Sequence, residues 1–592
     1  MNRRACLLNV ERSLTGKRWE ARLDDGRAGL TLAQRLELPE IVGRLLAARG
    51  VNSESAALFL NPTLRDLLPN PSVLQDMDQA ARRLADAIER SEKIAVFGDY
   101  DVDGATSAAL LNRFLRAIGQ APRIYIPDRL AEGYGPNGPA LQRLAAEGAR
   151  VVVTVDCGIT AFEALEAARD AGLETIVVDH HAAEPRLPAA VAVVNPNRLD
   201  DESGLGQLAA VGVTFLLLVA LNRELRERGW YGTAGKTPPD LLALLDLVAL
   251  GTVCDVVPLT GLNRAFVAQG LKVMGKRRNL GLKALADVAG IDESPGTYHA
   301  GFLLGPRVNA GGRVGQAPLG AELLATEDIA GAANIARQLD AYNAERKEIE
   351  AAVLDQALVQ IETEGTPKGL VFAASEGWHA GVIGIVASRL KERYNLPALV
   401  VALENGVGKG SARSVPGVDL GAAVIAARQA ELLVNGGGHP MAAGLTVAED
   451  RVGDLRSYLS ERLGETLRKL DYVPALGIDG AIEVGGANSE LVGHLERLAP
   501  YGTANAEPRF ALPQVRVLDA GVVGENHVRC VLGGEGKGPR LRAIAFRALD
   551  TPIGEALLKS RGLPLHIAGK LRPDSWRGGD AVQFLIDDAA RA

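Results

Sequence analysis

The sequence predicts a multidomain α/β protein that ends in a small β-barrel. From residue 93 to about residue 285, short Val- and Ile-rich runs alternate with amphipathic stretches, which is typical of a parallel sheet covered by helices on both faces. A second pattern of this kind follows an uninterrupted charged helical stretch. After Tyr472-Val473-Pro474, about five short strands with glycine-rich turns fill roughly 120 residues, a spacing that suits a small barrel.

The composition indicates a folded chain that is long enough for several hydrophobic cores. Of its 592 residues, 47% are hydrophobic and 23% are charged, close to the average of globular proteins. Lys and Arg number 65 against 72 Asp and Glu, which gives a net charge of −7. This net charge does not indicate which kind of partner the protein binds, because binding depends on the local electrostatic field of a single groove.

The cysteines and the apolar runs bear on the environment of the protein. Cys6, Cys157, Cys254 and Cys530 lie far apart without a CxxC pair, which argues against a zinc ribbon or a disulfide framework and favours the reducing cytoplasm. The longest uncharged apolar run, over 208–221, has 14 residues. A membrane span needs roughly 18 to 20, so no membrane is expected as a partner.

Changes of pattern divide the chain into five parts. Residues 1–55 carry Leu, Ala and Arg at helical spacing and are expected to form an N-terminal helical cap. Residues 56–285 form the first α/β domain, and residues 286–365 connect it to the second. The connection includes a linker helix over 337–364, a stretch without Gly or Pro. The second α/β domain occupies 366–470, and the barrel occupies 471–592.

A cluster of acidic residues follows the first strand of the first α/β domain. Asp99, Asp101 and Asp103 stand between the strand KIAVF and a helix. Three carboxylates this close repel one another unless a cation or a basic partner compensates for their charge. An EF-hand is excluded because its closing Glu is missing. A solvated turn remains the alternative.

Further acidic and imidazole side chains follow the later elements of that domain. VVVTV ends at Asp156, TIVV ends at Asp179-His180-His181, and the apolar helix DLVALGTV leads to Asp255. Because the carboxyl ends of parallel strands meet at one edge of a sheet, these groups are expected to converge there. Carboxylates with one or two imidazoles favour Mn²⁺ or Mg²⁺ over structural zinc. Two such ions can activate a water and stabilise the leaving oxygen of a phosphoryl transfer.

Taken in order, these motifs resemble those of the DHH phosphoesterase superfamily. DYDVDG, VDCG, DHH and CDVVPL look like its four motifs. GPRVNAGGR (305–313), GWHAGVIGIVASRL (377–390), KGSARS (409–414) and GGGHPMAAG (436–444) look like the DHH-associated domain of its RecJ branch, and APYGTANAEPRF (499–510) resembles the entry to the OB-fold of that branch. The resemblance covers about residues 55–592. It implies a DHH parallel-sheet domain and a DHH-associated α/β domain joined by a long helix, followed by an OB-fold.

The resemblance implies a single-stranded-DNA-specific exonuclease that works 5′ to 3′ and releases 5′-mononucleotides in DNA repair and recombination. Two Mn²⁺ or Mg²⁺ ions would be its cofactors, held in the cleft between the two α/β domains. The positions that match metal ligands of the family are Asp101, Asp103, Asp156, His180 and Asp255. Asp99 and His181 match residues that support the site or contact the scissile phosphate.

The resemblance also implies a surface that binds nucleic acid. The matching positions are Arg307, Asn309, Arg313, Ser411, Arg413, Gly436, Gly437, Gly438 and His439. The glycines would let backbone amides approach an anion. In the barrel, Trp576, with Arg572 and Arg577 nearby, is the aromatic residue expected to stack on a base, although core packing accounts for most aromatic residues of OB-folds.

Three positions depart from the family pattern. Phe97 stands where some members carry a metal-binding His, which leaves that ligand position to water. Val102 replaces a common Ala, and Ala504 stands where Gly is usual in the turn that leads into the OB-fold. None of these changes removes a motif carboxylate.

Two other functions remain open on the sequence alone. A DHH phosphodiesterase that acts on oligoribonucleotides or cyclic dinucleotides would need no OB-fold. A catalytically silent nucleic-acid-binding scaffold would not need every motif carboxylate and the His180-His181 pair. By analogy with the family, single-stranded DNA, a single-strand-binding protein and a helicase are the expected partners, and a monomer is the expected state.

Overall fold

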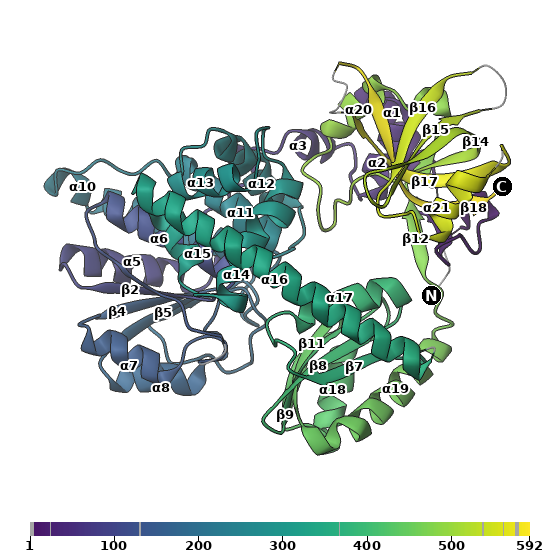
Figure 1. Ribbon diagram of the computed structural model, residues 1–592. Helices are drawn as coiled ribbons and strands as arrows, with labels where there is room; N and C mark the ends of the chain where they lie inside the picture. The colour runs from purple at the N-terminus through teal and green to yellow at the C-terminus, as the bar shows by residue number, and fades with distance from the viewer. Residues whose placement is uncertain are drawn as a thin grey trace.

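The structure is a computed structural model that describes residues 5–23, 25–129, 132–365, 367–534, 538–560, 562–574 and 579–592. Figure 1 shows three lobes, namely two α/β domains joined by one long helix and a C-terminal barrel. Within the described residues, no helix combines the length and the apolar character needed to cross a membrane.

The first α/β domain is built on a five-stranded parallel sheet with the strand order β3-β2-β4-β5-β6. Its strands are β2 (Ile94–Gly98), β3 (Arg123–Tyr125), β4 (Val151–Val155), β5 (Glu174–Val178) and β6 (Ala192–Val194). Alternate residues of a strand enter different cores, as Val152 and Val153 of β4 do. The continuous Val and Ile runs of the sequence therefore mark a sheet that is covered on both faces.

The helices of this domain form one large core and one small core. The large core contains α5 (Met77–Glu89), α6 (Val102–Ala117), α9 (Ala210–Glu227), α11 (Leu245–Cys254), α12 (Gly261–Gly275), α13 (Leu280–Val288), α14 (Gly305–Val314) and α15 (Leu319–Ala325), with the short α10 (Trp230–Thr233) beside α9. The small core, on the other face of the sheet, contains α7 (Gly138–Ala146) and α8 (Phe162–Asp170). The large core thus extends beyond residue 285 into α14 and α15.

The long joining helix is α16 (Ile329–Glu364), which has 36 residues and crosses from one α/β domain to the other (Figure 1). Its first half contributes Ala336 and Leu339 to the core of the first domain, and its second half contributes Val353 and Ala357 to that of the second. The expected joining helix is confirmed, and it begins earlier than expected because the side chain of Asp328 caps its N-terminus.

The second α/β domain has a five-stranded mixed sheet with the order β10-β11-β9-β8-β7. Its strands are β7 (Val371–Glu376), β8 (Ala398–Glu404), β9 (Val407–Arg413), β10 (Asn435–His439) and β11 (Ala442–Ala448). One face is covered by α17 (Ile383–Tyr394), chiefly over β8 and β9, and the other by α18 (Leu420–Gln429) and α19 (Val452–Lys469). On the α17 side, β10 and β11 present mostly glycine and other small residues.

The C-terminal domain is a closed five-stranded barrel, so the expected OB-fold is confirmed. Its strands run in the order β14 (Phe510–Val523), β15 (His527–Gly533), β16 (Arg540–Ala545), β18 (Val582–Arg591) and β17 (Pro564–Pro573), and β14 pairs with β17 to close it. The short β13 (Gly480–Ala481) lies beside β14, and the helices α20 (Ser489–Glu496) and α21 (Pro552–Lys559) flank the barrel.

The helices of the expected N-terminal cap are present, and they cap the barrel. The strand β1 (Arg18–Ala21) pairs in parallel with β12 (Ala475–Ile478). The helices α1 (Arg27–Leu36) and α2 (Glu40–Ala48) contribute to the barrel core, and α3 (Ala56–Leu60) and α4 (Leu64–Leu67) lead on to the first α/β domain. Trp19 is fully buried and donates a hydrogen bond from Nε1 to Asp588 Oδ2 at 2.9 Å. Both ends of the chain therefore fold into one body.

The segment over 498–509, here called the latch segment, holds the barrel to the first α/β domain. Arg264 of α12 is 2% exposed, and its guanidinium donates hydrogen bonds to the carbonyl oxygens of Phe59, Leu498, Ala499 and Pro500. The N–H of Leu259 donates to the carbonyl oxygen of Thr503 at 2.9 Å. The sequence motif that resembles the OB-fold entry is thus an interdomain contact.

Replacing Ala504 with Gly is expected to stabilise the latch segment. Ala504 has φ 60°, a left-handed conformation that costs a residue with a Cβ about 1 kcal/mol. Ala504 therefore adopts the left-handed turn that glycine would adopt without strain, and its own backbone is strained there. We expect the free energy of unfolding, measured in urea, to rise by roughly 0.5 to 1 kcal/mol. Ala506→Gly is the control, and an equal gain there would contradict this explanation.

Candidate metal centre and nucleic-acid interface

Acidic and imidazole side chains meet at the carboxyl edge of the first sheet. Their potential ligand atoms form three overlapping groups, and within each group these atoms lie within 4.8 Å of one another: Asp156, His180 and His181; Asp103, His180 and Asp255; Asp99, Asp101 and Asp156. The structure therefore brings together every residue that the sequence predicted for catalysis and metal binding. Since Asp156 and His180 each belong to two groups, the edge offers adjoining positions for two ions.

Helix N-termini hold two of these carboxylates. Asp101 caps α6, and its Oδ1 accepts hydrogen bonds from the N–H groups of Asp103 and Gly104 at 2.8 and 3.1 Å. Asp103 is 1% exposed and accepts from the N–H groups of Ala210 and Val211 at 2.6 and 2.9 Å. These two N–H groups belong to the first residues of α9, so the positive end of that helix stabilises the carboxylate.

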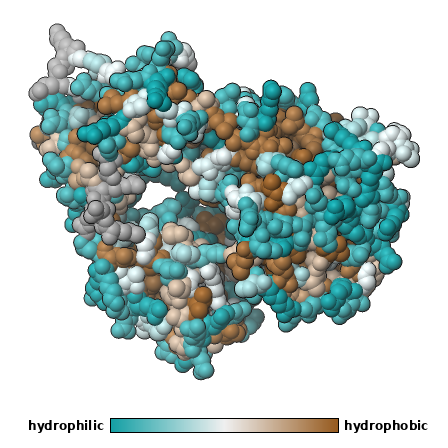
Figure 2. Space-filling model, turned by 180° about the vertical axis from the view of Figure 1, so that it is seen from behind, coloured by the Kyte–Doolittle hydropathy of each residue, from teal (hydrophilic) through white to brown (hydrophobic). Residues whose placement is uncertain are grey.

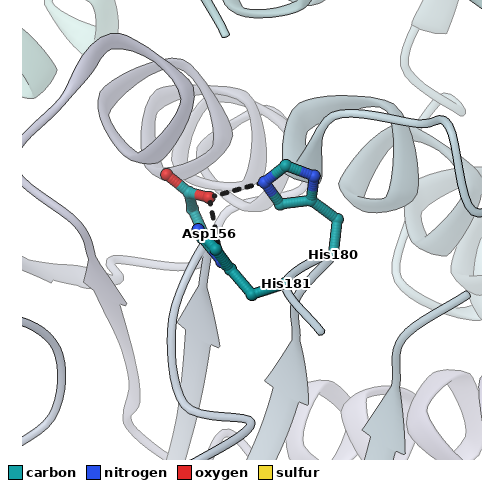
Figure 3. A group of neighbouring side chains, drawn as sticks. All are labelled: Asp156, His180 and His181. Carbon is teal, nitrogen blue, oxygen red and sulfur yellow. Dashed lines mark ion pairs between the residues drawn. The ribbon is translucent and has the colours of Figure 1, made fainter. Parts of the chain in front are cut away.

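Asp156 and His180 lie at the ends of the neighbouring strands β4 and β5 (Figure 3). The Nε2 atom of His180 is 3.4 Å from Asp156 Oδ1, 3.7 Å from Asp255 Oδ2 and 3.9 Å from Asp103 Oδ2. Asp156 has φ 62°, an unfavourable conformation for a residue other than glycine. Such strain occurs where the backbone must aim a functional side chain.

Asp179 orients His181, a role that the sequence reasoning missed. Its Oδ1 lies 2.7 Å from His181 Nδ1 and also accepts from the N–H groups of His180 and His181. Burial alone would raise the pKa of Asp179, but the hydrogen bonds from His181 and Ile159 outweigh it and lower that pKa. The carboxylate is therefore ionised and can only accept, so Nδ1 of His181 donates. The sequence did contain a signal for this role, since Asp179 is the first residue of the DHH motif.

The buried ligand atoms fit a divalent cation. Four of them have no hydrogen-bond partner among the described residues: Asp99 Oδ1, Asp156 Oδ1, Asp255 Oδ2 and His180 Nε2. Burial, and next repulsion from neighbouring carboxylates, raises the pKa values of the three aspartates. Burial lowers the pKa of His180 to about 4, so its imidazole is neutral and able to ligate. Oxygen ligands with one imidazole suit Mn²⁺ or Mg²⁺.

Removing metal is expected to make the folded state less stable as the pH rises. The folded-state pKa values of Asp99, Asp103 and Asp255 are about 8, 7 and 9, against 3.8 ordinarily. At a pH between the ordinary pKa and the raised folded-state pKa values, the folded chain holds protons that the unfolded chain has released. Rising pH therefore favours unfolding. Bound metal replaces the protons and reverses this effect.

The measurement is the melting temperature of chelator-treated protein with and without Mn²⁺, across a pH series. We expect the gain from Mn²⁺ to grow from mildly acidic to mildly alkaline pH. Monovalent salt at matched ionic strength is the control. A gain that does not change with pH would contradict the assignment of these carboxyl groups.

A basic pocket of about 350 Å³, here called the arginine pocket, adjoins the metal centre. Arg129, Arg313, Arg413, Lys409 and Ser411 line it, and its described lining includes no carboxylate. Burial and next repulsion from Arg129 lower the pKa values of Arg313 and Arg413. The guanidinium of Arg129 lies 4.8 Å from the centre of the ring of Tyr100, the residue between Asp99 and Asp101. Cations that repel one another in this way favour an anion.

Arg129 is a second residue that the sequence reasoning missed. It follows β3, so it comes from the same carboxyl edge of the sheet as the metal ligands. The sequence signal was a basic residue after a strand of the parallel sheet, but only the approach of the second α/β domain places it beside Arg413. Three of the residues predicted to bind nucleic acid, Arg313, Ser411 and Arg413, thus share one pocket.

The other residues predicted to bind nucleic acid lie elsewhere. Arg307 is half-buried and pairs with Asp340 at 2.8 Å, so it ties α14 to α16. Asn309 is half-buried on α14. Gly437 and His439 pair with Gly444 and Ala442 on β10 and β11.

The three consecutive glycines have different environments. An added Cβ at Gly436 would meet Val424 and Leu433 under α18, and one at Gly438 would meet the backbone of Ala442 and Ala443, whereas Gly437 has open space. Gly437 is therefore the glycine that can admit an anion. Trp576 lies outside the described residues.

Family models match three consecutive parts of the chain: the DHH family N-terminal domain over 93–252, the DHHA1 domain over 367–465 and the RecJ OB domain over 478–588. The single-stranded-DNA-specific exonuclease RecJ of Dickeya dadantii (strain 3937) is 37% identical over 561 residues, which are 93% of this chain and 96% of that protein. RecJ of Escherichia coli (strain K12) is 37% identical over 564 residues, with the same two shares.

Solved structures agree with these matches. RecJ from Thermus thermophilus in complex with Mn²⁺ has a TM-score of 0.79 and 30% identity, over 96% of this chain and 78% of that one. The complex of the same protein with Mg²⁺ has a TM-score of 0.74. Since the three domains follow one another in order and the relatives cover nearly the whole chain, this protein belongs to the RecJ family of single-stranded-DNA-specific exonucleases.

Proposed function

We propose that this protein is a metal-dependent exonuclease that digests single-stranded DNA from its 5′ end and releases 5′-mononucleotides. One observation carries the proposal. At the sheet edge, buried ligand atoms that have no hydrogen-bond partner among the described residues lie next to a basic pocket with no described carboxylate. A phosphodiester has the negative charge for the pocket and the oxygen atoms for a metal. Figure 2 shows an opening through the molecule between the lobes.

Different side chains would perform different parts of the reaction. When two divalent ions are bound, they activate a water molecule and stabilise the leaving oxygen. Asp101, Asp103, Asp156, His180 and Asp255 would hold these ions. The arginine pocket would fix a phosphate of the strand and so align the scissile bond.

His181 and Asp99 complete the proposed site. Burial lowers the pKa of His181, but the hydrogen bond and the charge of Asp179 outweigh burial and raise it. With Nδ1 donating to Asp179, the ring keeps Nε2 for a phosphate oxygen. Asp99 is 4% exposed and would support the metal centre beside Asp101 and Asp156.

The deciding experiment follows nucleotide release from DNA labelled at either end. Single-stranded DNA, a dinucleotide and blunt duplex are compared, with Mn²⁺, with Mg²⁺ and with a chelator. We expect metal-dependent release of mononucleotides from the 5′ end of the single strand. Preference for the dinucleotide would favour a small-substrate phosphodiesterase, and binding without hydrolysis would favour a silent scaffold.

Arg413→Ala is expected to weaken binding of single-stranded DNA and to lower its dependence on salt. Each lost phosphate contact changes the slope of log affinity against log salt by about 0.7 for single strands. Arg307→Ala is the matched comparison, since Arg307 already pairs with Asp340. It should lower the melting temperature more than it changes the slope. Equal slopes for Arg413→Ala and the unmodified protein would remove Arg413 from the phosphate-binding set.

We also propose that the protein acts as a cytoplasmic monomer together with a single-strand-binding protein and a helicase. Membership of the RecJ family supports this proposal. Sedimentation of the protein alone and with each partner tests it, and a stable dimer would contradict the monomer.

A further inference from the structure

Tyr100 lies where the metal centre and the arginine pocket meet. It stands in the loop between β2 and α6, and its neighbours in the chain, Asp99 and Asp101, belong to one of the three ligand groups. The side chain of Tyr100 is half-buried and packs against the large core of the first α/β domain. The backbone of Tyr100 is therefore tied to the metal centre, while its ring is available for a different contact.

The ring of Tyr100 holds one cation of the arginine pocket. The guanidinium of Arg129 lies 4.8 Å from the centre of this ring. Arg129 is exposed, and it is repelled by the other two guanidinium groups of the pocket, those of Arg313 and Arg413. This repulsion would drive an exposed guanidinium out of the pocket into solvent. The face of an aromatic ring attracts a cation, so the ring of Tyr100 opposes that movement.

The helix α14 also packs against Tyr100. A Cβ added at Gly312 would lie 3.1 Å from the carbonyl oxygen of Tyr100 and 3.2 Å from its Cβ, so glycine is what allows this close approach. The next residue of α14 is Arg313, whose Nη1 donates a hydrogen bond to the carbonyl oxygen of Gly381 in the second α/β domain at 3.1 Å. Both arginines that the first domain contributes to the pocket are therefore positioned against Tyr100, Arg129 directly and Arg313 through its neighbour Gly312.

We propose that Tyr100 is a positioning residue that holds Arg129 in the arginine pocket and fixes the pocket relative to the metal centre. The proposal rests on the function proposed above and adds a residue to it. Because Asp99 and Asp101 flank Tyr100 in the chain, a shift of this residue would change the distance from the phosphate-binding arginines to the metal ligands. The face of the ring performs this role, since the guanidinium of Arg129 lies over it.

The test measures affinity for single-stranded DNA in the full chain with Asp156→Asn, so that the strand stays intact, in the presence of Mn²⁺. A cation held over an aromatic ring at an exposed site corresponds to a factor of about 2 to 5 in an equilibrium constant. We expect Tyr100→Leu to weaken binding by this factor, and Tyr100→Phe, which keeps the ring, to restore it. In a chain that also carries Arg129→Ala, Tyr100→Leu should cause no further loss. Tyr394→Leu is the control, since this half-buried ring of α17 lies 5.9 Å from the guanidinium of Arg393 and outside the pocket.

Fluorinated phenylalanines in place of Tyr100 give a second measurement in case Tyr100→Leu fails to fold. Fluorine atoms on the ring keep its shape but weaken the negative charge of its face, which is what attracts a cation. The affinity for single-stranded DNA should therefore fall stepwise as fluorine atoms are added. In the presence of Arg129→Ala, fluorination should have no effect.

The outcomes separate this inference from the proposed function. If the unmodified protein does not digest single-stranded DNA, the proposed function fails, and the affinities still decide the role of Tyr100. The positioning role is wrong if Tyr100→Leu or fluorination weakens binding equally with and without Arg129, or not at all. Calorimetry of Tyr100→Leu with Asp156 intact should show unchanged Mn²⁺ affinity. A loss of Mn²⁺ affinity would mean that Tyr100 only supports the loop of metal ligands.

Discussion

Asp156→Asn is expected to abolish hydrolysis of single-stranded DNA while the fold remains intact. Asp156 belongs to two of the three ligand groups, and its Oδ1 is buried without a partner among the described residues. Loss of a residue that only supports a metal ligand costs about 10- to 100-fold, so loss of a direct ligand should exceed 100-fold. The metal-free protein should not be destabilised, because burial and the neighbouring carboxylates raise the pKa of Asp156 and so already favour its uncharged form, which asparagine matches in charge and size.

The measurements are mononucleotide release, Mn²⁺ binding by calorimetry and the melting temperature. Asp170→Asn at the end of α8 is the control, since that side chain is 72% exposed. It should behave as the unmodified protein does. Retained hydrolysis in Asp156→Asn would remove this residue from the metal centre.

Arg264→Leu is expected to cause the largest loss of stability. The leucine fills part of the space, but the carbonyl oxygens of Phe59 and Ala499 lose the guanidinium as a donor. Those of Leu498 and Pro500 lose it too and keep the hydrogen bonds from Asn505 Nδ2. Each buried acceptor that is left unsatisfied costs about 1 to 3 kcal/mol. The guanidinium also lies 3.9 Å from the centre of the ring of Phe59, so that contact is lost too.

Urea denaturation measures the loss, and limited proteolysis of the latch segment shows whether the barrel has separated. Arg65→Leu, at an exposed arginine of α4, is the control. Short oligonucleotides should still be cleaved, since the predicted metal ligands all belong to the first α/β domain. An unchanged unfolding midpoint would show that Arg264 does not hold the barrel.

The metal centre could be predicted from the sequence because its ligands follow buried strands. Asp156 and His180 stand directly after Val-rich runs, and parallel strands bring their carboxyl ends together whatever the details of packing. Asp179 was visible in the same motif, but its function depends on a hydrogen bond to a ring nitrogen. Arg129 was not predictable, because Arg413 and Lys409 beside it come from the second α/β domain.

The arrangement of the N-terminal segment could not be predicted for the same reason. Helical spacing in α1 and α2 indicates an apolar face but does not say which surface covers it. The covering surface is the barrel, at the far end of the chain. In the sequence, Arg264 likewise resembles any arginine on the surface of a helix. Its buried role depends on the latch segment, which is distant in the chain.

The pairing of β1 with β12 has a consequence for how the protein is made. About 450 residues separate Ala21 from Ala475, so the first strand leaves the ribosome long before its partner is translated. At about 5 to 20 residues per second, the delay is roughly 20 to 90 s. During that time Trp19, Leu45 and Leu46, all fully buried in the finished protein, lack their partners. Nascent chains of this protein should therefore bind chaperones at their N-terminus until synthesis is complete.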